Sequence, residues 1–175
     1  MFKTILTALF LAIALTLQIT GLPKLLTGVI VNVIYVVLYY SCGFRHVFMM
    51  AVLTPLLAFF TGHLAPPLIP LAPFIAFGNI AMVCCYHLVK DKKMAVRITA
   101  PAIVKALSIA IPGSLLAGSA GFNQAALMGV HIVISLQFFT AAPGILLGEY
   151  IVSRLTPLLK RYTDQPKGDF LCFRR

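Results

Sequence analysis

The chain has 175 residues, of which 61% are hydrophobic and only 10% are charged, and its formal net charge is +10. A soluble domain typically contains about 25% charged residues, so the composition excludes an ordinary globular domain and predicts an all-α integral membrane protein. The cations form no stripe interleaved with aromatic residues, which argues against a nucleic-acid partner and leaves the lipid bilayer as the surrounding medium.

Six apolar segments separated by polar turns predict six transmembrane helices. In chain order they cover residues 4–23, 25–44, 47–62, 71–89 (or from 74), 98–117 and 124–152. A cleaved signal peptide ending at Ala12-Ile13-Ala14 is the alternative for the first segment, although its apolar run continues past that site. We therefore expect residues 1–153 to form one membrane domain and residues 154–175 to form a basic, partly disordered cytoplasmic tail.

The loop 90–97 determines the predicted orientation, because it holds four cations between two long apolar runs. Short loops rich in Lys and Arg remain on the cytoplasmic side of a membrane. With six spans, both termini then lie in the cytoplasm, together with every Lys and Arg except Lys24 and Lys105. We expect a multi-pass protein of the plasma membrane.

Polar groups within the spans are the candidate ligand contacts, because each is costly in lipid unless it is paired or faces water. Counted from the outer surface, three of them lie about two helical turns deep, and two others lie deeper. Together with a tyrosine near the first amide and a histidine in the Pro-rich segment 63–73, they predict a substrate-binding cavity that opens outward. The predicted substrate-binding residues are Asn32, Tyr35, His63, Asn79, Lys105, His131 and Gln137. The alternative is that the amides form hydrogen bonds between packed helices.

Lys105 is the most informative single residue, since it is a cation within a predicted span. Its ammonium could reach the cytoplasmic interface along its flexible stem, serve as counter-ion for an anionic or carboxylate-bearing ligand, or pair with Glu149 near the inner surface. On the last span, Gly144 and Gly148 lie one turn apart and, with Thr140, predict a face for close helix packing.

Motifs for catalysis are scarce. Three of the four acidic residues fall in loops or the tail, so no carboxylate pair is available for acid–base or metal chemistry. No Gly-rich loop ending in Lys-Ser/Thr is present, and the four cysteines lack the spacing of metal ligands. We therefore expect no enzyme activity, no cofactor and no metal in this chain.

Short segments along residues 5–150 resemble, in order and spacing, the substrate-binding (S) components of energy-coupling-factor importers. They are GLP (21–23), TGVIVN (27–32), LTPLLA (53–58), PFIAFGN (73–79), PAIVK (101–105) and QFFTA (137–141). The resemblance implies a six-helix subunit that captures a vitamin-like micronutrient in an outer-half cavity. Its implied partners are a transmembrane coupling (T) component and two cytoplasmic ATPases, with Ala8 and Ala12 on the first helix as the docking residues.

Two other functions remain open from the sequence. A stand-alone secondary transporter of a small, possibly anionic solute could couple to protons through His131 or Glu149. A structural membrane subunit without a ligand would use all of its polar groups for helix packing, and small residues recurring every fourth position from Thr4 would then pack within the bundle.

Overall fold

The computed structural model describes the backbone of residues 2–62, 69, 71–119 and 124–163, and the side chains of 2–62, 69, 71–115 and 135–157. These residues form six α-helices and no strand. The helices are α1 (Phe2–Ile19), α2 (Lys24–Cys42), α3 (Phe44–Phe60), α4 (Ala72–Val89), α5 (Met94–Ser119) and α6 (Gln124–Thr163). The all-helical prediction is confirmed for this part of the chain, and the helices follow the predicted spans closely. The last helix continues through Thr163, beyond the domain boundary expected at residue 153.

Five of the described helices are long and apolar enough to cross a membrane, namely α1, α2, α4, α5 and α6. At a rise of about 1.5 Å per residue, a helix of 18 residues covers roughly 27 Å, close to the thickness of a hydrocarbon core. α3 is equally apolar but has only 17 residues. The architecture is that of a multi-pass membrane protein, and the sixth crossing remains a prediction.

Glycine and proline set the ends of the first helices. α1 leads into Gly21, which has φ +71°, and α2 begins directly after Pro23. α2 ends at Gly43, whose φ of +92° is accessible mainly to glycine, and whose N–H donates to the carbonyl of Tyr39 at 3.0 Å. Because Gly21, Pro23 and Gly43 end one helix and start the next, α1, α2 and α3 run in alternating directions.

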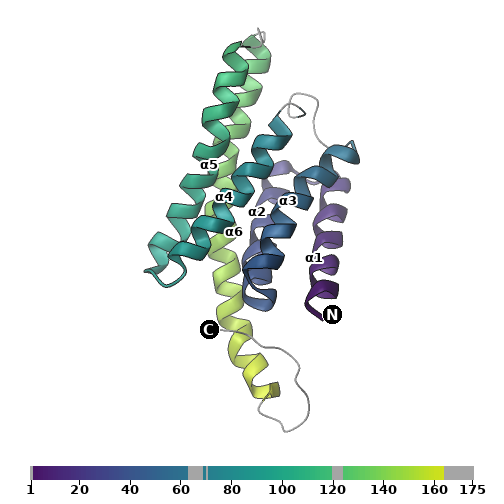
Figure 1. The fold of residues 1–175 in the computed structure, drawn as a ribbon, viewed down its shortest axis with the longest axis vertical. Coiled ribbons are helices and arrows are strands. Elements are labelled where there is room, and N and C mark those ends of the chain that lie inside the picture. The colour runs from purple at the N-terminus through teal and green to yellow at the C-terminus, as the bar shows by residue number, and fades with distance from the viewer. Residues whose placement is uncertain (1, 63–68, 70, 120–123, 164–175) are drawn as a thin grey trace.

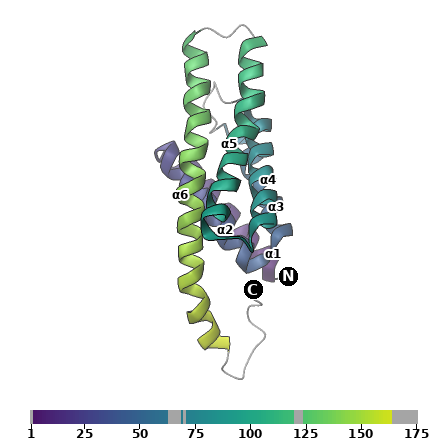
Figure 2. The same ribbon diagram turned by 90° about the vertical axis from the view of Figure 1, so that its left-hand side faces the viewer.

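The turns gather the cations at one end of the bundle. The N-terminus, the turn at Gly43 and the α4–α5 turn all lie toward the lower end in Figure 1, whereas the α1–α2 turn lies toward the upper end. In the sequence, these three segments and their flanks hold Lys3, Arg45, Lys90, Lys92, Lys93 and Arg97, so we call the lower end the basic end. The later part of α5 and the first part of α6 run together beyond the other helices at the opposite end (Figures 1 and 2).

Glycines bring α6 directly against α2. A Cβ added at Gly144 would lie 2.6 Å from the Cβ of Asn32, and one added at Gly148 would lie 2.6 Å from the Cβ of Val36. Thr140 continues this face, because its Cγ2 would lie 2.8 Å from a Cβ at Gly28. Small residues let membrane helices approach this closely, so the predicted packing face of α6 is confirmed.

α1 is the helix least covered by the rest of the described structure. Ala14 is its one buried residue, and large apolar side chains such as Ile5 and Leu9 are exposed. Ala8 and Ala12, the predicted docking residues, are exposed as well. An apolar helix with this exposure has only lipid or another protein to contact in a membrane.

Candidate functional site

A cavity of about 370 Å³ lies in the half of the bundle away from the basic end. Its lining comes from the second half of α1, the α1–α2 turn, the first halves of α2 and α4, the second half of α3, and one residue each of α5 and α6. The position follows from topology, because those helix ends meet at the α1–α2 turn. Three of the predicted substrate-binding residues, Asn79, Lys105 and Gln137, line it together.

Lys105 lies at the inner wall of the cavity and is only 4% exposed. Its Nζ donates a hydrogen bond of 2.9 Å to Oδ1 of Asn32, which is completely buried on α2. Asn32 does not itself line the cavity, so it acts behind Lys105 and holds the ammonium in place. The ammonium of Lys105 therefore reaches the level of the Asn32 amide, although counting along the helices predicts a deeper position for Lys105.

Two of the sequence-based interpretations of Lys105 are wrong: that its ammonium reaches the cytoplasmic interface, and that it pairs with Glu149. Its side chain does not extend to the basic end, because its ammonium is bonded to Asn32. Nor does it pair with Glu149, which forms its ion pair with Arg97. The remaining described acidic residue, Asp91, is exposed near the α4–α5 turn, so Lys105 has no carboxylate partner within the described residues.

Asn79 is the second buried polar group of the cavity. Its side chain comes from α4, is 5% exposed, and its Oδ1 has no hydrogen-bond partner within the described residues. Gly78 sits beside it against Ile109 of α5, where an added Cβ would lie 2.6 Å from Cγ1. This close approach of α4 to α5 holds Asn79 and Lys105 on neighbouring walls. Buried acceptors in proteins are nearly always hydrogen-bonded, so an unpartnered one at a cavity indicates a place for a guest molecule.

Further polar groups complete the lining. Gln18 of α1 contributes an Oε1 atom that is buried and likewise without a partner among the described residues, and Thr54 of α3 is buried at the wall. Lys24 and Thr27 line the edge beside the α1–α2 turn. These residues are absent from the predicted set. Thr54 gives no signal in the sequence beyond its position before Pro55, and Gln18 lies shallower than the predicted polar layer.

The remaining predicted site residues do not join the cavity lining that the structure describes. Tyr35 is 1% exposed and borders a separate, much smaller void toward the basic end, together with Tyr39 and Tyr86. The predicted contacts of His63 and of the His131 side chain fall outside the described residues. The cavity therefore unites only part of the predicted set.

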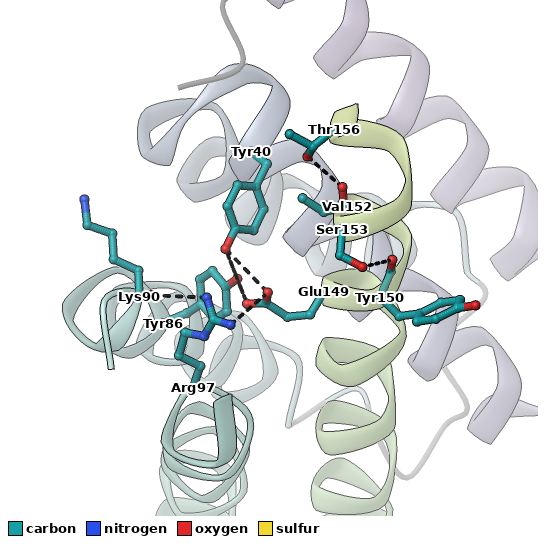
Figure 3. Close-up of polar contacts among 9 residues, drawn as sticks. All are labelled: Tyr40, Tyr86, Lys90, Arg97, Glu149, Tyr150, Val152, Ser153 and Thr156. Carbon is teal, nitrogen blue, oxygen red and sulfur yellow. Dashed lines mark hydrogen bonds and ion pairs between the residues drawn. The ribbon is translucent and has the colours of Figure 1, made fainter. Parts of the chain in front are cut away.

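A second polar cluster lies near the basic end and joins four helices (Figure 3). Glu149 of α6 is 7% exposed and accepts a short hydrogen bond from the hydroxyl of Tyr86 on α4. The hydroxyl of Tyr40 on α2 lies 3.4 Å from the same carboxylate, and Arg97 of α5 pairs with it at 3.4 Å. Arg97 also donates to the carbonyl of Lys90 at 3.3 Å. Sequence reasoning places Glu149 at this level but does not predict its partners.

Comparison with known proteins found no similar one: no protein-family model, curated protein or solved structure matches the chain. The site must therefore be interpreted from its own geometry. Within the described residues, that geometry combines one buried ammonium, two amide oxygens without hydrogen-bond partners and apolar walls around one cavity.

Proposed function

We propose that this chain is the substrate-capture subunit of an energy-coupling-factor type importer. It binds a vitamin-like or other small micronutrient from outside the cell. It delivers the micronutrient together with a T component and two cytoplasmic ATPases. The observation that carries the proposal is the cavity with Lys105 and Asn79 on its walls, in the half of the bundle away from the basic end.

Orientation supports capture from outside. Loops rich in Lys and Arg remain cytoplasmic, so the basic end faces the cytoplasm and the cavity half faces the exterior of the plasma membrane. Lys24, on the edge of the cavity, is the described cation at the opposite end, and it is exposed. A solute arriving from outside then meets the cavity before it meets the packed core around Tyr35.

The surface of α1 supports association with a partner. Ala8 and Ala12 are exposed on a helix that the remaining described structure hardly covers. Small side chains allow a second helix to approach closely in a membrane. We assign this face to the T component, in agreement with the family resemblance of the sequence.

The test is release of small molecules from the purified, detergent-solubilised protein by denaturation, followed by mass spectrometry. We expect one compound in near-equimolar amount with the chain. If no compound is released, and no member of a micronutrient library raises the melting temperature, the capture function is wrong.

A stand-alone secondary transporter is the second candidate, and the Glu149 cluster is the observation that favours it. A buried carboxylate that bridges Tyr40, Tyr86 and Arg97 is the kind of intramembrane group found in proton relays. Uptake of the released compound into vesicles that contain this chain but no ATPase would decide for the transporter. Uptake that requires the T component and ATPases would decide for the capture subunit.

A further inference from the structure

We infer that the compound held in the cavity is a small monocarboxylate that also carries an N–H or O–H donor. This inference rests on the proposed function, in that it takes the cavity to be a ligand site. It names the class of substrate by charge and hydrogen-bonding pattern, both of which follow from the walls of the cavity.

The charge balance of the walls indicates one negative charge on the ligand. The lining contains two cations, Lys24 and Lys105, and no acidic residue. Lys24 is exposed, so water can screen its charge, but Lys105 is buried, and the amide oxygen of Asn32 is its one side-chain hydrogen-bond partner among the described residues. A buried charge is costly unless it is paired. A monoanion balances the buried charge of Lys105, whereas a cation is repelled and the second charge of a dianion meets only the solvent-screened charge of Lys24.

The donor count of Lys105 indicates a carboxylate as the anionic group. An ammonium has three N–H donors and no acceptor, and one donor is used by Oδ1 of Asn32 at 2.9 Å. Within the part of the chain that the structure describes, two donors are left for the oxygens of a ligand. Gly144 packs directly beside the Cβ of Asn32, and the hydrogen bond from Lys105 to Asn32 holds the ammonium at the wall of the cavity.

The amides across the cavity need donors that a carboxylate cannot provide. Oδ1 of Asn79 and Oε1 of Gln18 are buried acceptors without partners among the described residues, and an ionised carboxylate is acceptor-only. A ligand that also presents an N–H or O–H group satisfies these acceptors. Leaving such acceptors unpaired is costly, which gives the site a means of rejecting analogues that lack the donor.

The apolar part of the lining limits the rest of the molecule. Val31, Pro55, Ala58 and Ile75 form walls between the polar groups. The volume of about 370 Å³ lies near the lower end of the range of about 300–1,000 Å³ that is typical of pockets for drug-sized ligands. The ligand is thus a compact molecule with an apolar body.

The experiment compares five aromatic probes. 4-Hydroxyphenylacetate, its primary amide, tyramine and 4-hydroxyphenyl phosphate differ in charge, and phenylacetate lacks the phenol donor. Melting temperatures are measured in detergent for the wild type, Lys105→Met and Asn79→Leu. Lys92→Met is the matched control, because it removes an exposed cation at the other end of the bundle. In parallel, the compound released from each purified variant is identified by mass spectrometry.

We expect a monocarboxylate with a donor group from the wild type and from Lys92→Met, with occupancy reduced roughly 30-fold or more in Lys105→Met. Of the probes, 4-hydroxyphenylacetate should stabilise the wild type most, and Asn79→Leu should weaken its preference over phenylacetate. A released compound that is neutral, cationic or multiply charged overturns the inference, and so does full retention of a monocarboxylate by Lys105→Met. Absence of any released compound and of stabilisation by every probe overturns the proposed function instead.

Discussion

Gly144 of α6 lies directly on Asn32 of α2, so that a Cβ at this glycine would approach the Cβ of Asn32 to 2.6 Å and the carbonyl oxygen of Val29 to 2.7 Å. Asn32 in turn accepts the hydrogen bond of the Lys105 ammonium. The close contact that Gly144 allows on α6 thereby positions the Asn32 amide of α2, and this amide in turn holds the Lys105 ammonium of α5. The wall of the cavity depends on this stack.

Gly144→Ala should destabilise the protein by about 1–3 kcal/mol, because the added methyl group overpacks a contact made partly of backbone. The measurement is thermal unfolding in detergent. Leu147→Ala is the control, since Leu147 is exposed on the same helix and its truncation should change stability by less than about 0.5 kcal/mol. Equal melting temperatures for wild type and Gly144→Ala would show that α2 and α6 can separate freely.

Asn32→Leu should destabilise the chain strongly, by about 3–5 kcal/mol, because it leaves the Lys105 ammonium buried without a partner. Adding Lys105→Met should restore most of the loss, since a well-packed apolar pair of similar size replaces a polar one at little cost. The double-mutant cycle is followed by thermal unfolding. Additive effects of the two changes would contradict a direct contact.

Glu149→Gln should cost about 1.5–3 kcal/mol, the usual worth of hydrogen bonds to a charged group, because Arg97 and Tyr86 lose their anionic acceptor. Its effect should shrink in an Arg97→Met background, where one partner is already absent. Asp91→Asn is the control for loss of an acidic group, as Asp91 is exposed. A penalty for Glu149→Gln that is unchanged by Arg97→Met would argue that the ion pair contributes nothing.

Ala8→Trp and Ala12→Trp should leave ligand occupancy and melting temperature unchanged, because both alanines are exposed. They should abolish co-purification with a T component and ATPases from the same organism, since a bulky ring prevents close helix contact. Ile13→Trp serves as control on the neighbouring exposed face. Normal assembly of both alanine variants, measured by affinity capture through a tagged ATPase, would remove α1 from the proposed docking surface.

The helices and the turns between them could be predicted from the sequence because hydropathy, prolines and charged loops act locally. The hydrogen-bond partner of Lys105 could not be predicted from the sequence. Counting residues gives a position along a helix axis, but the contact with Asn32 depends on how α2 and α5 lean and rotate, and on a flexible side chain that covers the difference in height. The same applies to Glu149, whose partners come from three other helices.

Asn79 and Gln137 could be predicted as cavity residues because an amide within an apolar span is costly unless it is paired or faces a polar space. Tyr35 follows the same helix face as Asn32 but is directed into the packed core. Gln18 is also an amide within an apolar span, but it lies shallower than the predicted polar layer, and no local pattern marks Thr54 of α3 as a cavity residue.

The two polar clusters also decide how these helices find their relative orientation. Between helices in lipid, apolar surface gives no hydrophobic driving force, since acyl chains are as oily as leucine. Rotating α5 about its own axis would break its close packing on Gly78 and would withdraw Lys105 from Asn32 and Arg97 from Glu149 at once. Two polar contacts at different depths along α5 therefore fix its rotation relative to α2 and α6, and they favour one alignment of the inserted helices.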